Sequence, residues 1–149
     1  MLINEMTKDE CSAALARASF GRLGCSLDNQ PYVVPLYFVY ESDYIYSLST
    51  FGQKIEWMRE NPKVCVQIDE TIGTAGWLSV IAYGLYQELV EPRYKAERSH
   101  ARQLLEKRSG WWQVALAERQ LKAAEHLVDP LFFRIHIDSL TGLRTVEDK

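Results

Sequence analysis

The sequence predicts a mainly β protein of the α+β class, in which an antiparallel meander or barrel carries helices at its periphery. Five strand-like segments follow one another with only short breaks between them. Helix-type sequence rich in Lys, Arg, Glu and Ala dominates only after Pro92. A last segment, 131–138, alternates apolar and polar residues, which is typical of a half-buried strand.

Length and composition set the class of protein. The chain has 149 residues and no repeat, linker or low-complexity tract, so we expect one domain over residues 1–149. Its net charge of −3, with basic residues scattered among acidic ones, argues against a nucleic-acid partner. No apolar run is long enough to span a bilayer, and the first residues lack the features of a signal peptide. We therefore expect no membrane partner and a cytoplasmic location.

Local signals define the first elements. Thr7 and Glu10 have the spacing of a capping box, and apolar residues then recur at helical spacing as far as Ala18. Strands are predicted at 22–27 and 32–40, and Asp28-Asn29 between them suits a hairpin turn.

The segment 44–69 combines a strand, a Ser/Thr/Gly turn, a short helix and a second strand. Ser47, Ser49 and Thr50 place three hydroxyls at the end of the first strand, and Gly52 lets the backbone bend before the helix. Free amide groups at a helix start favour an anion, and Lys54 adds a positive charge, so a phosphate site is one interpretation. The alternative is ordinary helix capping with a solvated lysine, since neither GxxxxGK[ST] nor GxGxxG is present.

The second half of the chain predicts a long strand at 77–90, helices at 94–107 and 112–126, and the final strand. The break before the second helix is followed by Trp111 and Trp112, which cannot both point into one helical face. The simpler interpretation is that these indoles pack in the core or in a dimer contact. The alternative hypothesis is that one of them covers a pocket.

Other kinds of site have little support in the sequence. His100, His126 and His136 are isolated from one another, so no metal site is predicted. The three cysteines are odd in number and far apart, which predicts neither a disulfide framework nor a zinc site. Cys25 and Cys65 lie in apolar settings typical of inert thiols, and no GxSxG sequence indicates a hydrolase.

Six segments occur in a characteristic order and spacing. They are PYVVPLYF at 31–38, STFGQK at 49–54, NPKVCVQID at 61–69, GWLSVIAYGLYQEL at 76–89, the Trp111-Trp112 pair, and FRIHIDSLTG at 133–142. Taken together they resemble the flavin-nucleotide-binding proteins related to pyridoxamine 5′-phosphate oxidase. The resemblance covers nearly the whole chain after the first helix.

The resemblance implies an FMN-binding split β-barrel that is antiparallel and dimeric, with FMN at each end of the interface of a homodimer. In relatives, the strand matching 33–37 lies along the flavin ring, and the segment matching 47–54 wraps the ribityl chain and phosphate. Lys54 is the expected phosphate ligand. The strand at 77–80 approaches the cofactor from the same subunit or from its partner. The implied cofactor-binding residues are Val34, Pro35, Leu36, Ser47, Ser49, Thr50, Gly52, Gln53, Lys54, Trp77, Ser79 and Val80.

The function implied is a flavin-dependent oxidoreductase that acts on a small molecule with electrons from a reduced nicotinamide or deazaflavin. The flavin carries the redox chemistry, so no catalytic acid or base is assigned. A non-catalytic flavin-binding protein is the main alternative, and a haem-binding split-barrel protein is the third. Gln53 stands where true pyridoxamine phosphate oxidases usually have Arg, and Ser47 about where the nitroimidazole-resistance branch often has His. The resemblance therefore predicts a cofactor but no particular substrate.

Overall fold

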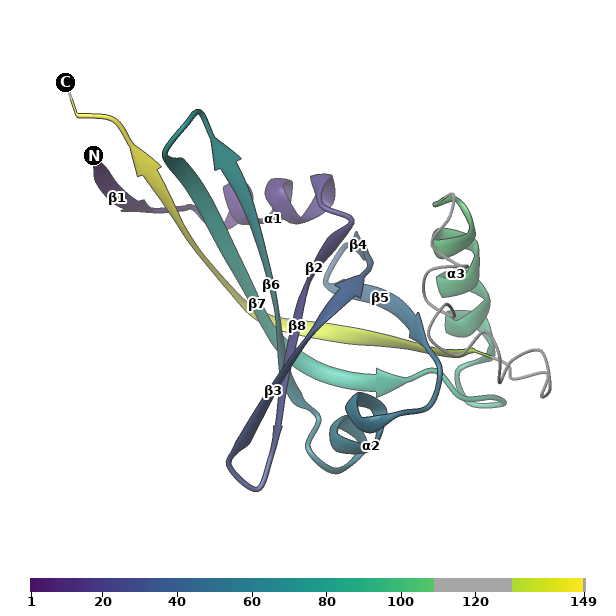
Figure 1. Cartoon of the computed structure of the whole chain (residues 1–149). Coiled ribbons are helices and arrows are strands. Elements are labelled where there is room, and N and C mark those ends of the chain that lie inside the picture. Colours follow the sequence, from purple (N-terminus) through teal and green to yellow (C-terminus); the bar gives the residue numbers. More distant parts are fainter. Residues whose placement is uncertain (109–129, 149) are drawn as a thin grey trace.

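The computed structural model describes residues 1–108 and 130–148. Within these residues one eight-stranded sheet has the order β3-β2-β6-β7-β8-β5-β4, with β1 paired to β8 (Figure 1). All of its strand pairs are antiparallel. The strands are β1 (Leu2–Glu5), β2 (Phe20–Leu27), β3 (Gln30–Tyr37), β4 (Val39–Glu41), β5 (Tyr44–Ser49), β6 (Lys63–Ile72), β7 (Gly76–Glu88) and β8 (Leu131–Val146). The helices are α1 (Lys8–Arg17), α2 (Gln53–Glu60) and α3 (Lys95–Glu106).

Helix α1 begins with the predicted capping box. The Thr7 hydroxyl accepts a hydrogen bond from the Glu10 amide at 3.1 Å, and the Thr7 amide donates to the Glu10 carboxylate at 2.9 Å. The helix packs closely on β8 at Gly142, where an added Cβ would lie 2.6 Å from the Cys11 sulfur. Glycine at this position therefore allows the helix to approach the strand.

The hairpin between β2 and β3 is also confirmed. Asp28 and Asn29 have φ values of 50° and 66°, the left-handed conformation that a two-residue type I′ turn requires. The single strand predicted at 32–40 is wrong, because the chain forms β3 and β4 with a break at Phe38. The fully buried Phe38 ring lies at this corner, and the Phe38 amide donates to the Ser19 carbonyl at 3.1 Å, one residue beyond the last β2–β3 pair.

The strand, turn, helix and strand predicted for residues 44–69 are present as β5, α2 and β6. Helix α2 ends before Asn61, whose extended φ of −127° is the conformation favoured before proline. Gly52 has a φ of −176°, an extended backbone open to any residue. The expected bend at Gly52 therefore does not depend on the conformational freedom of glycine.

The C-terminal strand is longer than predicted. Strand β8 continues past Asp138 to Val146 because it pairs along its length with β5, then β7, and finally β1. Helix α3 lies within the predicted segment 94–107. The helix predicted at 112–126 and the Trp111-Trp112 pair lie outside the described residues.

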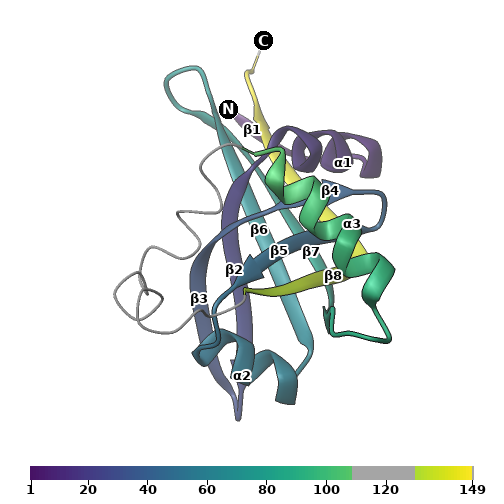
Figure 2. The ribbon, with the colours of Figure 1, turned by 90° about the vertical axis from the view of Figure 1, so that its right-hand side faces the viewer.

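Two apolar clusters hold the fold together. The larger one fills the barrel between the sheet, α1 and α2, and includes Leu23, Phe38, Met58 and Val66. The second lies beneath α3, which packs on β8 and β5 (Figure 2). No helix in the described part of the chain is long and apolar enough to cross a membrane.

Candidate functional site

The end of β5 and the turn that leads into α2 contain the three hydroxyls predicted to meet a phosphate. Ser47, Ser49 and Thr50 are 2%, 5% and 8% exposed. The Ser47 hydroxyl donates to the Tyr37 carbonyl at 2.7 Å, and the Ser49 hydroxyl donates to the Thr50 carbonyl at 2.8 Å. In this arrangement both serines stabilise the backbone of the turn, and Ser47 joins β5 to the end of β3.

Helix α2 begins directly after this turn. Its N-cap, Gly52, supplies no side-chain hydrogen bond, so the first amides of the helix are not satisfied by a capping side chain. Gln53 is exposed and Lys54 is half-buried. Burial raises the pKa of the Cys25 thiol, and the positive charge of Lys54 acts in the opposite direction. Lys54 belongs to the first turn of α2, the helix that packs on β2.

Strand β3 is linked to the turn before α2 by the Ser47–Tyr37 hydrogen bond. It is the outermost strand of the described sheet and pairs with β2 alone, so its other edge has no neighbouring strand there. Leu36 is 3% exposed within the main cluster, Val34 packs partly against that cluster, and Pro35 is exposed. Helix α2 packs on the neighbouring strand β2 and reaches β3 through a ring contact, in which the centroids of Trp57 and Tyr32 are 5.5 Å apart.

The three cofactor-binding residues predicted on β7 do not share one environment. Val80 is fully buried in the main cluster, whereas Trp77 is 36% exposed. The Ser79 hydroxyl accepts a hydrogen bond from the Gln67 amide group at 3.1 Å. Strands β2 and β6 separate β7 from β3 in the sheet. The structure therefore brings together β3 and the turn, and places Trp77 and Ser79 on the outer face of the sheet away from both.

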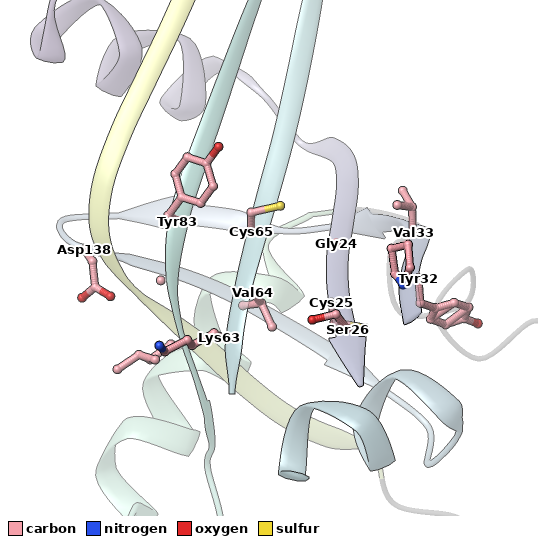
Figure 3. Close-up of a pocket in the computed structure, with 13 residues that line it drawn as sticks. Gly24, Cys25, Ser26, Tyr32, Val33, Lys63, Val64, Cys65, Tyr83 and Asp138 are labelled. Carbon is pink, nitrogen blue, oxygen red and sulfur yellow. The ribbon is translucent and has the colours of Figure 1, made fainter. Parts of the chain in front are cut away.

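The outer face of the sheet has a trough that the sequence analysis missed. Its volume is about 510 Å³, and it crosses β7, β6 and β2 (Figure 3). Lys63 and Asp138 lie toward one end, and Tyr32 and Val33 toward the other. The remaining lining residues are Gly24, Cys25, Ser26, Pro31, Val64, Cys65, Tyr83, Gly84 and Leu85.

Exposed apolar side chains surround this trough. Val33, Tyr83 and Leu85 are 65%, 44% and 37% exposed. The signal in the sequence is the outward-facing series on β7, where Trp77, Ile81, Tyr83 and Leu85 stand at alternate positions that a solvated sheet face would fill with polar residues. Burial raises the pKa of the Cys65 thiol, so this sulfur is in its neutral form near pH 7.

The described histidines have other partners. The His100 ring is paired with the Glu41 carboxylate at 2.5 Å, and the His136 ring stacks on Tyr44 with centroids 5.0 Å apart. In residues 1–108 and 130–148 no group of three or more His, Cys, Asp or Glu residues is arranged to hold a metal ion. His126 lies outside the described residues.

This architecture is the split β-barrel of flavin-binding proteins. The chain resembles the crystal structure of a FAD-binding protein from Mesorhizobium loti with a TM-score of 0.79 and 39% sequence identity, over 99% of each chain. A FAD-binding protein from Mycobacterium smegmatis shares the fold, with a TM-score of 0.67 and 16% identity over 99% of this chain and all of the other.

The sequence comparisons identify the family. The model of the family described as pyridoxamine 5′-phosphate oxidase matches residues 7–144. An uncharacterized protein of Rhizobium meliloti (strain 1021) is 37% identical over 143 residues, which is 95% of each chain. The chain therefore belongs to the pyridoxamine 5′-phosphate oxidase family, which confirms the resemblance found in the sequence.

Proposed function

We propose that this protein binds FMN and acts as a flavin-dependent oxidoreductase on a small molecule, with electrons from a reduced nicotinamide or deazaflavin. The chain belongs to the pyridoxamine 5′-phosphate oxidase family, and the observation that carries the proposal is its turn between β5 and α2. There the uncapped start of α2 and Lys54 follow directly after β5, whose Ser47 hydroxyl bonds the Tyr37 carbonyl at the end of β3. An anion is stabilised by free helix amides together with a nearby positive charge.

Each part of the site has a role in this proposal. Lys54 and the first amides of α2 hold the phosphate, while Ser47 and Ser49 keep the turn in shape through their bonds to backbone carbonyls. The open edge of β3 offers backbone groups to a flat ring. FMN supplies the redox chemistry when bound, and the protein supplies binding, orientation and control of access.

FAD is the second candidate cofactor. The Mesorhizobium loti protein is FAD-binding and is 39% identical to this chain, which favours this alternative. Titrating the flavin-free protein with FMN and with FAD separates the two, because FMN ends at the phosphate and FAD continues into an adenine nucleotide. Tighter binding of FMN is expected, and a clear preference for FAD would assign the larger cofactor.

Enzymatic turnover needs its own experiment, since a non-catalytic flavin-binding protein is the rival function. Within residues 47–54, Lys54 is the one ionisable side chain, so the turn supplies no carboxylate or imidazole for proton transfer. Reduced protein-bound flavin is mixed anaerobically with a candidate acceptor and an excess of electron donor. Repeated oxidation of the donor supports the oxidoreductase, and a single stoichiometric oxidation with every acceptor tried supports the binding protein.

We also propose that a second copy of the chain covers the outer face of the sheet. The support is the trough of about 510 Å³ with exposed Val33, Tyr83 and Leu85 around it, because contiguous apolar surface is typical of a protein contact. In such a homodimer Trp77 and Ser79, which are remote from β3 of their own chain, would approach the flavin of the partner copy.

Leu85→Asp should convert this dimer to a monomer of 17.2 kDa. Asp at this position would remove an apolar contact and bring a new charge into the interface, where desolvation opposes association even though Lys63 is its cross-strand neighbour. Light scattering after size-exclusion chromatography gives the mass. Val90→Asp is the matched control, because Val90 is 46% exposed and lies outside the trough. A wild-type monomer, or a dimeric Leu85→Asp variant, would contradict the proposed interface.

A further inference from the structure

An ion pair connects the end of helix α2 to the end of strand β7. Arg59 Nε donates to Glu88 Oε1 at 2.8 Å, and a terminal nitrogen of the same guanidinium donates to Glu88 Oε2 at 3.0 Å. The Glu88 side chain is 17% exposed. Two parallel bonds fix the relative orientation of the two groups, which a single contact does not.

The carboxylate of this pair is itself held by the core. The Tyr86 hydroxyl donates to Glu88 Oε1 at 2.7 Å, and the Tyr86 ring packs against buried Phe133 with centroids 5.4 Å apart. Burial acts to raise the pKa of Glu88, but the hydrogen bonds from Arg59 and Tyr86 outweigh it and the pKa is lowered. Glu88 is therefore an ionised, well-oriented acceptor for Arg59.

The other side of Arg59 reaches the turn. Its guanidinium carbon lies 5.2 Å from the centroid of the Phe51 ring, within the range of a cation–π contact. Phe51 directly precedes Gly52, the N-cap of α2, and is 50% exposed. One side chain thus connects both ends of α2: Arg59 belongs to its last turn and contacts the residue that precedes its first turn.

We infer that Arg59 and Glu88 are positioning residues for the proposed phosphate site at residues 51–54, where the turn leads into α2. The pair holds α2 on β7 and holds Phe51 in place, so the first amides of α2 and Lys54 are arranged before a phosphate arrives. Binding to an ordered loop avoids the cost of ordering it at the moment of binding. The inference rests on the proposed function, and neither residue is assigned a contact with the flavin.

The test compares FMN with riboflavin, which has the same ring and ribityl chain but no phosphate. Glu88→Gln removes the charge and one of the two acceptor oxygens. FMN should bind about tenfold more weakly, equivalent to about 1.4 kcal/mol. Riboflavin should change by less than about twofold. Both dissociation constants are measured by quenching of flavin fluorescence. Arg59→Lys, which keeps the charge but loses the planar fork, should shift FMN affinity in the same direction.

Arg17 and Glu70 provide a matched control. They form the same two-bond pair, at 3.1 and 3.2 Å, between α1 and β6, away from the turn. Glu70→Gln should leave both flavin affinities unchanged. Equal weakening of FMN and riboflavin by Glu88→Gln would indicate a general structural loss, and unchanged FMN binding would remove the positioning role; either result overturns the inference.

Amide hydrogen exchange of the flavin-free protein separates this inference from the proposed function. Glu88→Gln should speed exchange at residues 51–54, and Glu70→Gln should not. If the wild-type protein binds no flavin, the proposed function fails, whereas the exchange result still decides whether the pair orders the turn. Unchanged exchange at residues 51–54 would overturn the inference in either case.

Discussion

Replacing Lys54 by Met should weaken FMN binding by about 10- to 100-fold, because a hydrogen bond to a charged group contributes about 1.5–3 kcal/mol. Lys54 carries the one positive charge in residues 47–54, and methionine keeps most of the length of the side chain without it. Riboflavin binding should change little, since riboflavin has no phosphate. Fluorescence titration of the flavin-free protein with each compound gives both affinities.

Lys95→Met is the control for this substitution. Lys95 is exposed at the start of α3, so its removal changes the net charge equally without touching the turn. Raising the salt concentration should weaken FMN binding in the wild type and the control, and less so in Lys54→Met, because screening acts on the charge that the variant lacks. Equal loss of FMN and riboflavin affinity in Lys54→Met would place Lys54 outside the phosphate site.

Replacing Phe38 by Ala should reduce the free energy of unfolding by about 3–5 kcal/mol, the usual cost of removing a buried phenyl ring. Phe38 is fully buried at the corner between β3 and β4, and its ring packs near Gly21, where an added Cβ would lie 3.3 Å from the Phe38 Cε1 atom. The cavity left by the ring would lie beside β2, near the end of β3, the strand that borders the candidate site. Urea denaturation followed by tryptophan fluorescence measures the loss.

Phe51→Ala is the comparison for Phe38→Ala. Phe51 is 50% exposed and its ring contact is with Arg59, so its removal should cost only about 0.5–1 kcal/mol. Similar losses for the two substitutions would contradict the assignment of Phe38 as the packed corner of the barrel.

Elements with strong local signals could be predicted from the sequence. The hydrogen bonds at Thr7 and the turn at Asp28-Asn29 depend on neighbouring residues, and the structure has both. The break at Phe38 could not be predicted, because an apolar run has the same appearance whether it continues straight or turns a corner inside the core. The extension of β8 beyond Asp138 depends on pairing with β7 and β1, which are distant in sequence.

In the candidate site, too, the features formed by neighbouring residues could be predicted, and those formed by residues distant in sequence could not. The turn at 47–54 is contiguous in sequence, so its hydroxyls, glycine and lysine could be recognised together. The Arg59–Glu88 pair joins residues 29 positions apart, and no periodicity indicates that they meet. The trough on the outer face combines residues from several strands, so its shape follows from the register of the sheet.

The most direct test of flavin binding is to purify the protein without added cofactor, record its visible absorption spectrum, and identify any released chromophore by chromatography against FMN, FAD and riboflavin. The account predicts a flavin spectrum and released FMN. Released FAD would keep the site and change the cofactor. A colourless protein that binds neither FMN nor FAD on titration would contradict the central claim that the turn between β5 and α2 is a flavin phosphate site.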